Sequence, residues 1–315
     1  MSSMTPHVRK LAQRSIDEYY NAYTFFAWPE ALPRDCYWMS PELLSPFGTE
    51  IFDGLSQEQR HTLSQAELCN FFSITIHGER DLLAGVVPLL ERDAADELSE
   101  YLHHFVKEEN EHQWFFATFC RKYFGTILRP IGPPAAASPH PPDIAAFVTF
   151  AQILMFEEVG VFYNQKLAAD ERLPAIVREI NRVHYADESR HIAFGRLYVK
   201  ELHRALLGKY PADRLRELHD YIEAYLWWIG ESFFSPDVYK QVGLKGYATR
   251  QRLLGDEAVR GRLSAAFARS RRLISQLRAT LEPPDAAAER GGPEPAPDLD
   301  SDLEPALEPA RPGPA

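Results

Sequence analysis

The octapeptide HYADESRH contains two histidines and a glutamate at spacings that could bind a metal ion. His184 and Glu188 are four residues apart, and Glu188 and His191 are three apart. In an α-helix such residues share one face, so the three side chains would project together. Asp187 and Arg190 would turn aside, towards residues around the site or towards solvent. Imidazole and carboxylate groups in this arrangement are suitable ligands for a transition metal.

Three other segments place acids among apolar residues. EENEH spaces Glu109 and His112 three apart and is followed by WFFATF. FEEVG puts Glu157 and Glu158 between ILMF and VFY, and Glu79 lies between FFSITIHG and RDLLAGVV. A carboxylate in apolar surroundings is costly unless it is paired, protonated or bound to metal. Each of these segments therefore offers a candidate inward-facing acid.

Together these segments match the pattern by which helix bundles build dinuclear metal sites. Such sites take one Glu from each of two helices and a Glu-x-x-His from each of the other two. Carboxylates can bridge two metals, and neutral imidazoles leave positions open for dioxygen. The alternative is a set of buried salt bridges between these glutamates and nearby arginines, which would leave three histidines unexplained. With His184 the site would have three histidines, whereas the usual site has two. His184 could instead be a core histidine or one that orients a ligand.

The elements that must position these residues are helices. Apolar residues recur at helical spacing, and alternating β-branched segments between turn signals are absent. Short turns join the first two long helices and the last two, whereas the Pro-rich segment 125–143 forms a long middle link. This predicts an all-α, ferritin-like four-helix bundle with a long crossover and additional helices. The predicted helices span residues 56–90, 95–124, 144–169, 175–208, 212–234 and 248–281.

Composition divides the chain into three parts. Residues 1–55 are rich in proline and aromatic residues, and we expect an arm with short helices that wraps a core. Residues 56–281 form the expected ferritin-like metal-binding domain. Residues 282–315 hold nine acids and two arginines, which is −7 of the net charge of −11. This acidic, Pro-rich tail has few large apolar residues, so we expect it to be disordered, with its role open.

The chain of 315 residues is 45% hydrophobic and can bury a substantial core. Its net charge of −11 argues against nucleic acid or an anionic membrane as the main partner. Three cysteines far apart indicate a reducing compartment. The N-terminus lacks the apolar core of a signal peptide, and the apolar segment 144–156 is too short to span a bilayer. We therefore expect a soluble cytoplasmic protein.

The order of these motifs resembles the diiron N-oxygenases of the p-aminobenzoate N-oxygenase (AurF- and CmlI-like) family. An isolated Glu and an ExxH precede HxxxExxH, and the third histidine is the distinguishing feature of that family. The resemblance covers roughly residues 55–235. It favours Glu157 over Glu158 as the third-helix ligand, because the spacing of Glu157 to His184 resembles that of the family. The implied metal ligands are Glu79, Glu109, His112, Glu157, His184, Glu188 and His191.

This resemblance implies a non-haem diiron monooxygenase. Two iron ions, or a manganese–iron pair, would activate dioxygen through a peroxo-diferric intermediate. The enzyme would oxidise an amine nitrogen to a hydroxylamine, nitroso or nitro group in natural product biosynthesis. No catalytic residue beyond the metal ligands is implied. The chain has no dinucleotide fingerprint, so an external electron donor or reductase is a further partner, and the chain could form a homodimer.

Other functions remain open at the level of sequence. The first alternative is a diiron C–H hydroxylase or desaturase that acts on a carrier-bound or apolar substrate. A metal-storage protein, a manganese/iron oxidase and an inactive helical scaffold are further alternatives. The segment before Glu79 has no basic residue except His77, so we expect a largely apolar substrate pocket. Its candidate lining residues, each of which could equally belong to the core, are Phe72, Phe116, Phe150 and Phe162.

Overall fold

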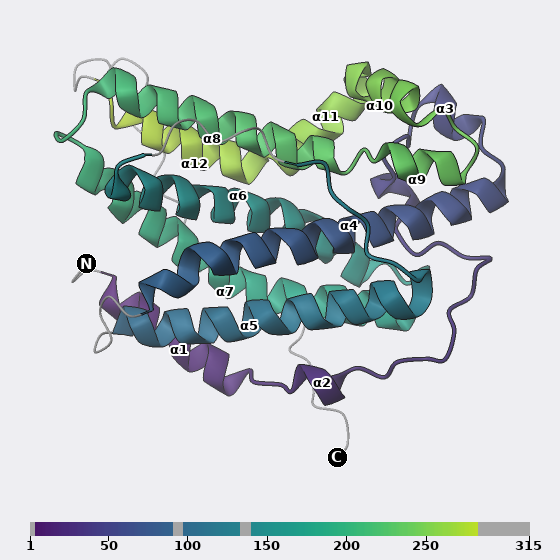
Figure 1. Cartoon of the computed structure of the whole chain (residues 1–315), viewed down its shortest axis with the longest axis horizontal. Helices are drawn as coiled ribbons and strands as arrows, with labels where there is room; N and C mark the ends of the chain where they lie inside the picture. The colour runs from purple at the N-terminus through teal and green to yellow at the C-terminus, as the bar shows by residue number, and fades with distance from the viewer. Residues whose placement is uncertain (1–3, 91–96, 133–139, 283–315) are drawn as a thin grey trace.

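The computed structural model describes residues 4–90, 97–132 and 140–282, and the regular elements in these ranges are helices (Figure 1). Strands are absent from this part of the chain, which contains only an isolated bridge between Leu207 and Tyr210. The predicted all-α class is therefore confirmed. The predicted disordered tail lies outside the described residues.

Four long helices form the bundle. They are α4 (Gln57–Val86), α5 (Glu97–Phe119), α6 (Pro142–Ala169) and α7 (Ala175–Leu206). The pairs α4–α5 and α6–α7 pack most extensively, as expected of two helical hairpins. In Figure 1, α5 ends at one end of the bundle and α6 begins at the other, so the connection must cross its length. This is the predicted ferritin-like arrangement.

Local sequence explains where these helices begin and why α6 is central. Ser56 caps α4 by accepting a hydrogen bond from the backbone N–H of Gln59, whose side chain accepts one from the Ser56 N–H in return. α6 is apolar on all sides, as expected of a helix covered on every face. By length and composition it could cross a membrane, but 67% of its most apolar window is buried inside the bundle. That burial identifies α6 as a core helix.

The remaining helices cover the bundle on two sides. α1 (Thr5–Asp17) packs on α5 and α7, and α8 (Ala212–Ser232) and α12 (Ala268–Ala279) pack on α6. Shorter elements complete the fold, namely α2 (Ala22–Phe25), η1 (Pro41–Leu43), α3 (Glu50–Asp53), η2 (Val87–Leu89), η3 (Cys120–Phe124), α9 (Pro236–Gln241), α10 (Gly246–Gly255) and α11 (Glu257–Ala266). The N-terminal arm thus contains a regular 13-residue helix as well as short ones.

The predicted helical stretch over residues 248–281 is helical in the structure but is not continuous. The structure divides this segment into α10, α11 and α12. The side chain of Asp256 accepts hydrogen bonds from the backbone N–H groups of Ala258 and Val259 and so starts α11 afresh. The apolar periodicity continues through the break, and for that reason the pattern alone missed it.

Glycines allow α4 and α6 to approach closely beside the candidate site. A Cβ atom on Gly78 would lie 2.2 Å from the ring of Phe156, and one on Gly85 would lie 2.9 Å from Thr149. Real Cβ atoms do not come this close to a neighbour, so a side chain at either position would have to displace that neighbour or move the helices apart. Gly78 precedes Glu79, and Phe156 precedes Glu157. The contact therefore sets the separation of two candidate ligands.

Candidate metal centre

The structure brings all seven predicted ligands together in the middle of the bundle. Glu79 comes from α4, Glu109 and His112 from α5, Glu157 from α6, and the remaining three from α7. All seven side chains are buried. Their ligand atoms form two groups that share Glu188, and within each group the atoms lie within 4.8 Å of one another. The groups are Glu79, His112, His184 and Glu188, and Glu109, Glu157, Glu188 and His191.

Outer carboxylates orient the two histidines of the Glu-x-x-His motifs. The Nε2 atom of His112 lies 3.0 Å from Asp187, and that of His191 lies 2.8 Å from Glu108. If each Nε2–H donates to its carboxylate, the lone pair is left on Nδ1. Nδ1 of His191 lies 2.8 Å from Glu109 and 3.3 Å from Glu188, inside the cluster. Both rings therefore present a metal-binding nitrogen to the centre.

His184 faces the cluster through its other nitrogen. Its Nε2 lies 3.0 Å from Glu188 and 3.2 Å from Glu79. Its Nδ1 lies 3.0 Å from the side-chain oxygen of Asn164, whose amide nitrogen donates to Asn181 at 2.8 Å. These two buried amides on α6 and α7 hold the third ring in place. The sequence reasoning identified neither asparagine.

Several buried ligand atoms lack a hydrogen-bond partner among the described residues. They are both carboxylate oxygens of Glu109 and of Glu157, Oε2 of Glu79, and Nδ1 of His112. Burying such atoms without partners costs free energy, and so many at one place indicates a missing cation. Four glutamates and three neutral histidines carry four negative charges, which two divalent ions would balance. The donor set therefore fits a dinuclear metal centre.

The electrostatics of the cluster agree with a metal site. Burial raises the pKa of Glu79 to about 8. Burial, and then the charge of Glu188, raises the pKa of Glu157 well above its ordinary value. Burial lowers the pKa of His191, but Glu188 and a hydrogen bond to Glu108 outweigh that effect and raise it overall. Without metal, protons must partly balance the carboxylates, and metal binding would release them.

A charged network around the ligands includes residues that the sequence reasoning missed. Arg190 donates to Asp187 at 2.6 Å and to Glu108 at 2.8 Å, and so links the two carboxylates that orient the histidines. Asp187 and Arg190 are 2% and 1% exposed, so neither faces solvent. The two adjacent glutamates at the start of EENEH could have indicated that Glu108 also lies near the site. Tyr20 donates to Asp187 at 2.8 Å from 167 residues away, and no local pattern could have revealed it.

The two neighbouring glutamates of α6 point in different directions. Glu157 belongs to the metal-binding cluster. Glu158 is also buried, but it pairs with Arg196 at 2.7 Å and accepts a hydrogen bond from Ser270 at 2.6 Å. The geometry therefore favours Glu157 as the ligand from this helix.

The four predicted pocket phenylalanines do not form one group. Phe72 packs on Phe116, and the Phe116 ring lies 4.8 Å from that of His184. Phe150 packs instead on Tyr198, and Phe162 lies at a separate cavity. Phe116 thus contacts a candidate ligand directly, and Phe72 packs behind it.

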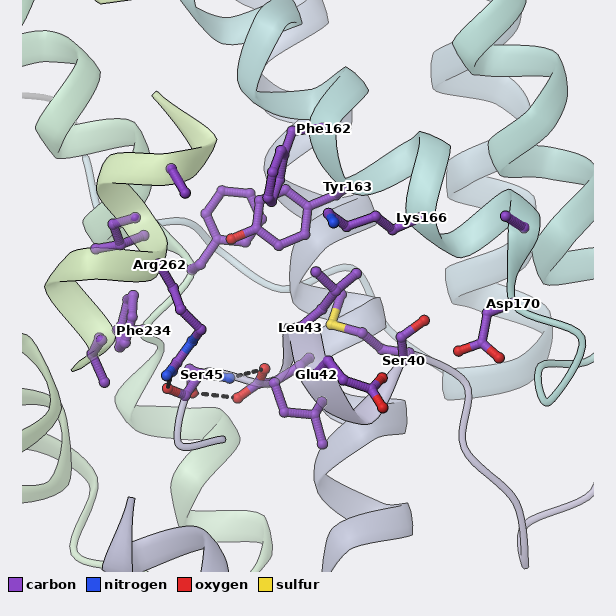
Figure 2. A pocket seen from close by; sticks show the side chains of 18 of the residues that line it. Ser40, Glu42, Leu43, Ser45, Phe162, Tyr163, Lys166, Asp170, Phe234 and Arg262 are labelled. Atoms are coloured by element: carbon purple, nitrogen blue, oxygen red, sulfur yellow. Dashed lines mark hydrogen bonds between the residues drawn. The ribbon is translucent and has the colours of Figure 1, made fainter. Parts of the chain in front are cut away.

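That cavity has a volume of about 640 Å³ and lies towards the start of α4 and the end of α6 (Figure 2). Phe162, Tyr163 and Phe234 line its apolar wall, and Lys166 and Arg262 supply positive charge. Arg172 is a third basic residue of this lining, which also includes the acids Glu42, Glu67 and Asp170, so the cavity is more highly charged than the apolar pocket expected from the sequence. Arg262 donates to the backbone oxygen of Ser45 at 2.8 Å. The buried Glu67 accepts hydrogen bonds from Ser45, and burial raises the pKa of this carboxyl to about 7.

Aromatic rings connect the cavity with the cluster. Tyr163 stacks on Phe233 and contacts Phe71 with 5.6 Å between ring centroids. Phe71 in turn packs on Phe72, which leads to Phe116 and His184. Tyr163 lies six residues beyond Glu157, or about 9 Å along α6.

The comparison with known families agrees with this geometry. No curated protein matches the chain significantly. The model of the p-aminobenzoate N-oxygenase family, AurF, matches residues 4–278. The match is longer than the expected 55–235 and includes most of the N-terminal arm, consistent with the contact of Tyr20 with the site. The chain is therefore an oxidoreductase and belongs to the p-aminobenzoate N-oxygenase family.

Proposed function

We propose that the protein is a diiron N-oxygenase that oxidises the amine nitrogen of a small molecule with dioxygen. The observation that carries this proposal is the cluster of four glutamates and three histidines, with His184 as the third histidine. All seven of these residues would hold the metals. Bound iron would supply the redox chemistry of dioxygen, and a manganese–iron pair is the alternative content.

The protein's own residues would orient the ligands and exclude water. Asp187, Glu108 and Asn164 fix the three imidazole rings. Phe116 packs on His184 and Phe72 packs on Phe116, so apolar rings would keep water from this side of the cluster. A dry, preorganised site protects reactive species from unproductive reactions with water.

We further propose that the substrate reaches the centre from the cavity. The apolar wall of Phe162 and Tyr163 suits an aromatic or aliphatic body, and Arg262 and Lys166 suit an anionic group at its other end. The aromatic row must then shift to let the amine reach the metals, a motion typical of gated active sites. We also propose that an external reductant supplies the electrons, that the protein is cytoplasmic and that it forms a homodimer.

The ligand assignment is tested with adjacent substitutions on α6. Glu157→Gln should lower the iron content from about two ions per chain, because it removes a charged ligand. Glu158→Gln is the matched control, and it should retain the iron because Glu158 faces Arg196. Full iron content in Glu157→Gln, or a wild-type protein that binds no iron after anaerobic loading, would contradict the assignment.

The reaction is tested with reduced, iron-loaded protein, dioxygen and a panel of arylamines, alkylamines and acyl chains. We expect mass spectrometry to detect hydroxylamine, nitroso or nitro products from an amine. Products hydroxylated or desaturated at carbon, with the amines unchanged, would instead identify a C–H oxygenase and overturn N-oxygenation.

A further inference from the structure

A chain of hydrogen bonds leads from the metal-binding cluster to the protein surface. Nε2 of His112 lies 3.0 Å from Oδ2 of Asp187, and the same oxygen accepts a hydrogen bond from the Tyr20 hydroxyl at 2.8 Å. Tyr20 is half-buried and lies between α1 and α2, outside the bundle. Asp187 and Tyr20 therefore connect a predicted metal ligand, His112, with the edge of the molecule.

The need to orient His112 does not by itself explain why Tyr20 donates a hydrogen bond to Asp187. Arg190 already donates to the other oxygen of Asp187 at 2.6 Å and holds that carboxylate. Glu108 orients His191 in the same way and is held by Arg190, without a bond to a tyrosine. The Tyr20 hydroxyl thus adds a connection to only one of the two histidines. It places an aromatic ring at the outer end of that connection.

Large apolar and aromatic side chains are exposed on the segment around Tyr20. Ile16, Tyr19 and Tyr23 are 49%, 60% and 54% exposed, and these are three of the large hydrophobic side chains exposed on the described surface. The Lys107 ammonium lies 4.6 Å from the ring of Tyr19. We call Ile16, Tyr19 and Tyr23 the N-terminal patch. Exposed aromatic side chains of this kind are enriched at protein interfaces.

The N-terminal patch and the substrate cavity lie on different elements. Figure 1 shows α1 and α2 beside α5, whereas α11, which contributes Arg262 to the cavity, lies beyond α4 and α6. A protein bound at the patch would therefore leave the cavity open. The bonded route that begins at Tyr20, next to Tyr19, points to an electron carrier as the partner, and such carriers form transient complexes through small interfaces.

We propose that a one-electron carrier protein docks on the N-terminal patch and that electrons pass through Tyr20, Asp187 and His112 to the metals. The inference rests on the proposed diiron function. Electron transfer weakens steeply with distance, so a short bonded route is favoured over a jump through packed side chains. Two carriers would each lose one electron, and two ferric ions would become ferrous. Tyr20 keeps its proton throughout and is a positioning residue for the transfer.

The route is tested by injecting electrons at a defined position. In full-length, iron-loaded Cys36→Ser/Tyr19→Cys protein, a ruthenium photosensitiser on the new thiol injects an electron after a flash. We expect Tyr20→Leu to slow the loss of the ferric absorption at least tenfold, and Tyr20→Phe to slow it because the link to Asp187 is lost. Tyr247→Phe, an exposed tyrosine on α10, is the matched control. Unchanged injection rates in both Tyr20 variants would overturn the route.

Docking is tested with a reduced [2Fe–2S] ferredoxin and with methyl viologen radical as the small donor. Ile16→Ser/Tyr23→Ser should slow reduction by ferredoxin several-fold and leave reduction by methyl viologen unchanged. No reduction of the wild-type protein by ferredoxin, or equal rates in both proteins, would overturn the docking surface. Iron content and the ferric spectrum are measured on every variant. A protein without iron would refute the diiron function itself, whereas normal iron with unaltered rates would refute only this inference.

Discussion

At the scale of single residues, the site depends on side chains that contact the candidate ligands without joining them. Asn164 is the clearest example, because its side-chain oxygen is the partner of Nδ1 in His184. Partners of this kind fix the ring orientation and the tautomer of a histidine ligand. His184 is also the residue that distinguishes this cluster from a site with two histidines.

Asn164→Ala should therefore weaken iron binding by about 10–100-fold, because His184 loses the partner that orients it. Asn70→Ala is the matched control, since Asn70 is equally buried and donates only to backbone oxygens of Ser232 and Phe233. Anaerobic iron titration measures both affinities. Equal affinities in the two variants would show that Asn164 does not position His184.

The buried Glu67 should make the stability of the protein depend on pH, and this effect does not involve the metal-binding cluster. Burial raises its pKa in the folded protein from the ordinary 4.5 to about 7. Between these two pH values the folded state binds more protons than the unfolded state, so the free energy of unfolding falls as pH rises. Above pH 7 the free energy of unfolding has fallen by the full amount, roughly 3 kcal/mol.

Glu67→Gln should remove this loss, because the amide stays neutral and can still bond with Ser45. Denaturation of iron-loaded protein by guanidinium at pH 5 and pH 8 measures the difference between wild type and variant. We expect the variant to gain stability relative to wild type at pH 8. A difference that does not change between the two pH values would contradict the raised pKa.

At the scale of elements, the separation of α4 and α6 controls the position of two candidate ligands. Gly78 packs against Phe156, and these residues precede Glu79 and Glu157. Any side chain at Gly78 must move the ring or push the helices apart. The ligand geometry and the packing of this interface are thus coupled.

Gly78→Ala should lower the melting temperature and the iron affinity, since overpacking typically costs about 1–3 kcal/mol. Gly261→Ala is the control within a helix, because a Cβ there would meet nothing within 4 Å. It should stabilise the protein by about 0.5–1 kcal/mol through improved helix propensity. A Gly78→Ala protein that melts at or above the wild-type temperature and binds iron normally would refute the tight contact.

At the scale of the whole molecule, the metal centre joins the two hairpins of the bundle. The seven candidate ligands come from all four long helices, and their buried charge opposes folding until a cation balances it. Metal binding should therefore stabilise the complete bundle rather than one local segment.

Anaerobic Fe(II) should raise the melting temperature in calorimetry, and chelation should reverse the change. A ligand at 100 times its dissociation constant stabilises the folded state by about 2.7 kcal/mol. The Glu157→Gln protein should show a smaller rise at the same Fe(II) concentration. Identical melting curves with and without Fe(II) would show that no metal binds to the folded state.

The sequence alone determined the helical class, the hairpin pairing and the grouping of His184, Glu188 and His191 on one helix face. These features follow from spacing along the chain, because residues three or four apart share a face whatever lies around them. The family resemblance, now confirmed, came from the same spacings.

Only the tertiary structure decided which side chains meet across the bundle. Glu157 and Glu158 both lie among apolar residues, and the packing of α12, which brings Ser270 to Glu158, separates their environments. Tyr20 reaches Asp187 across 167 residues, and Phe116 of α5 meets His184 of α7. Such contacts depend on how helices rotate and pack against each other, and local periodicity carries no information about partners so distant in the chain.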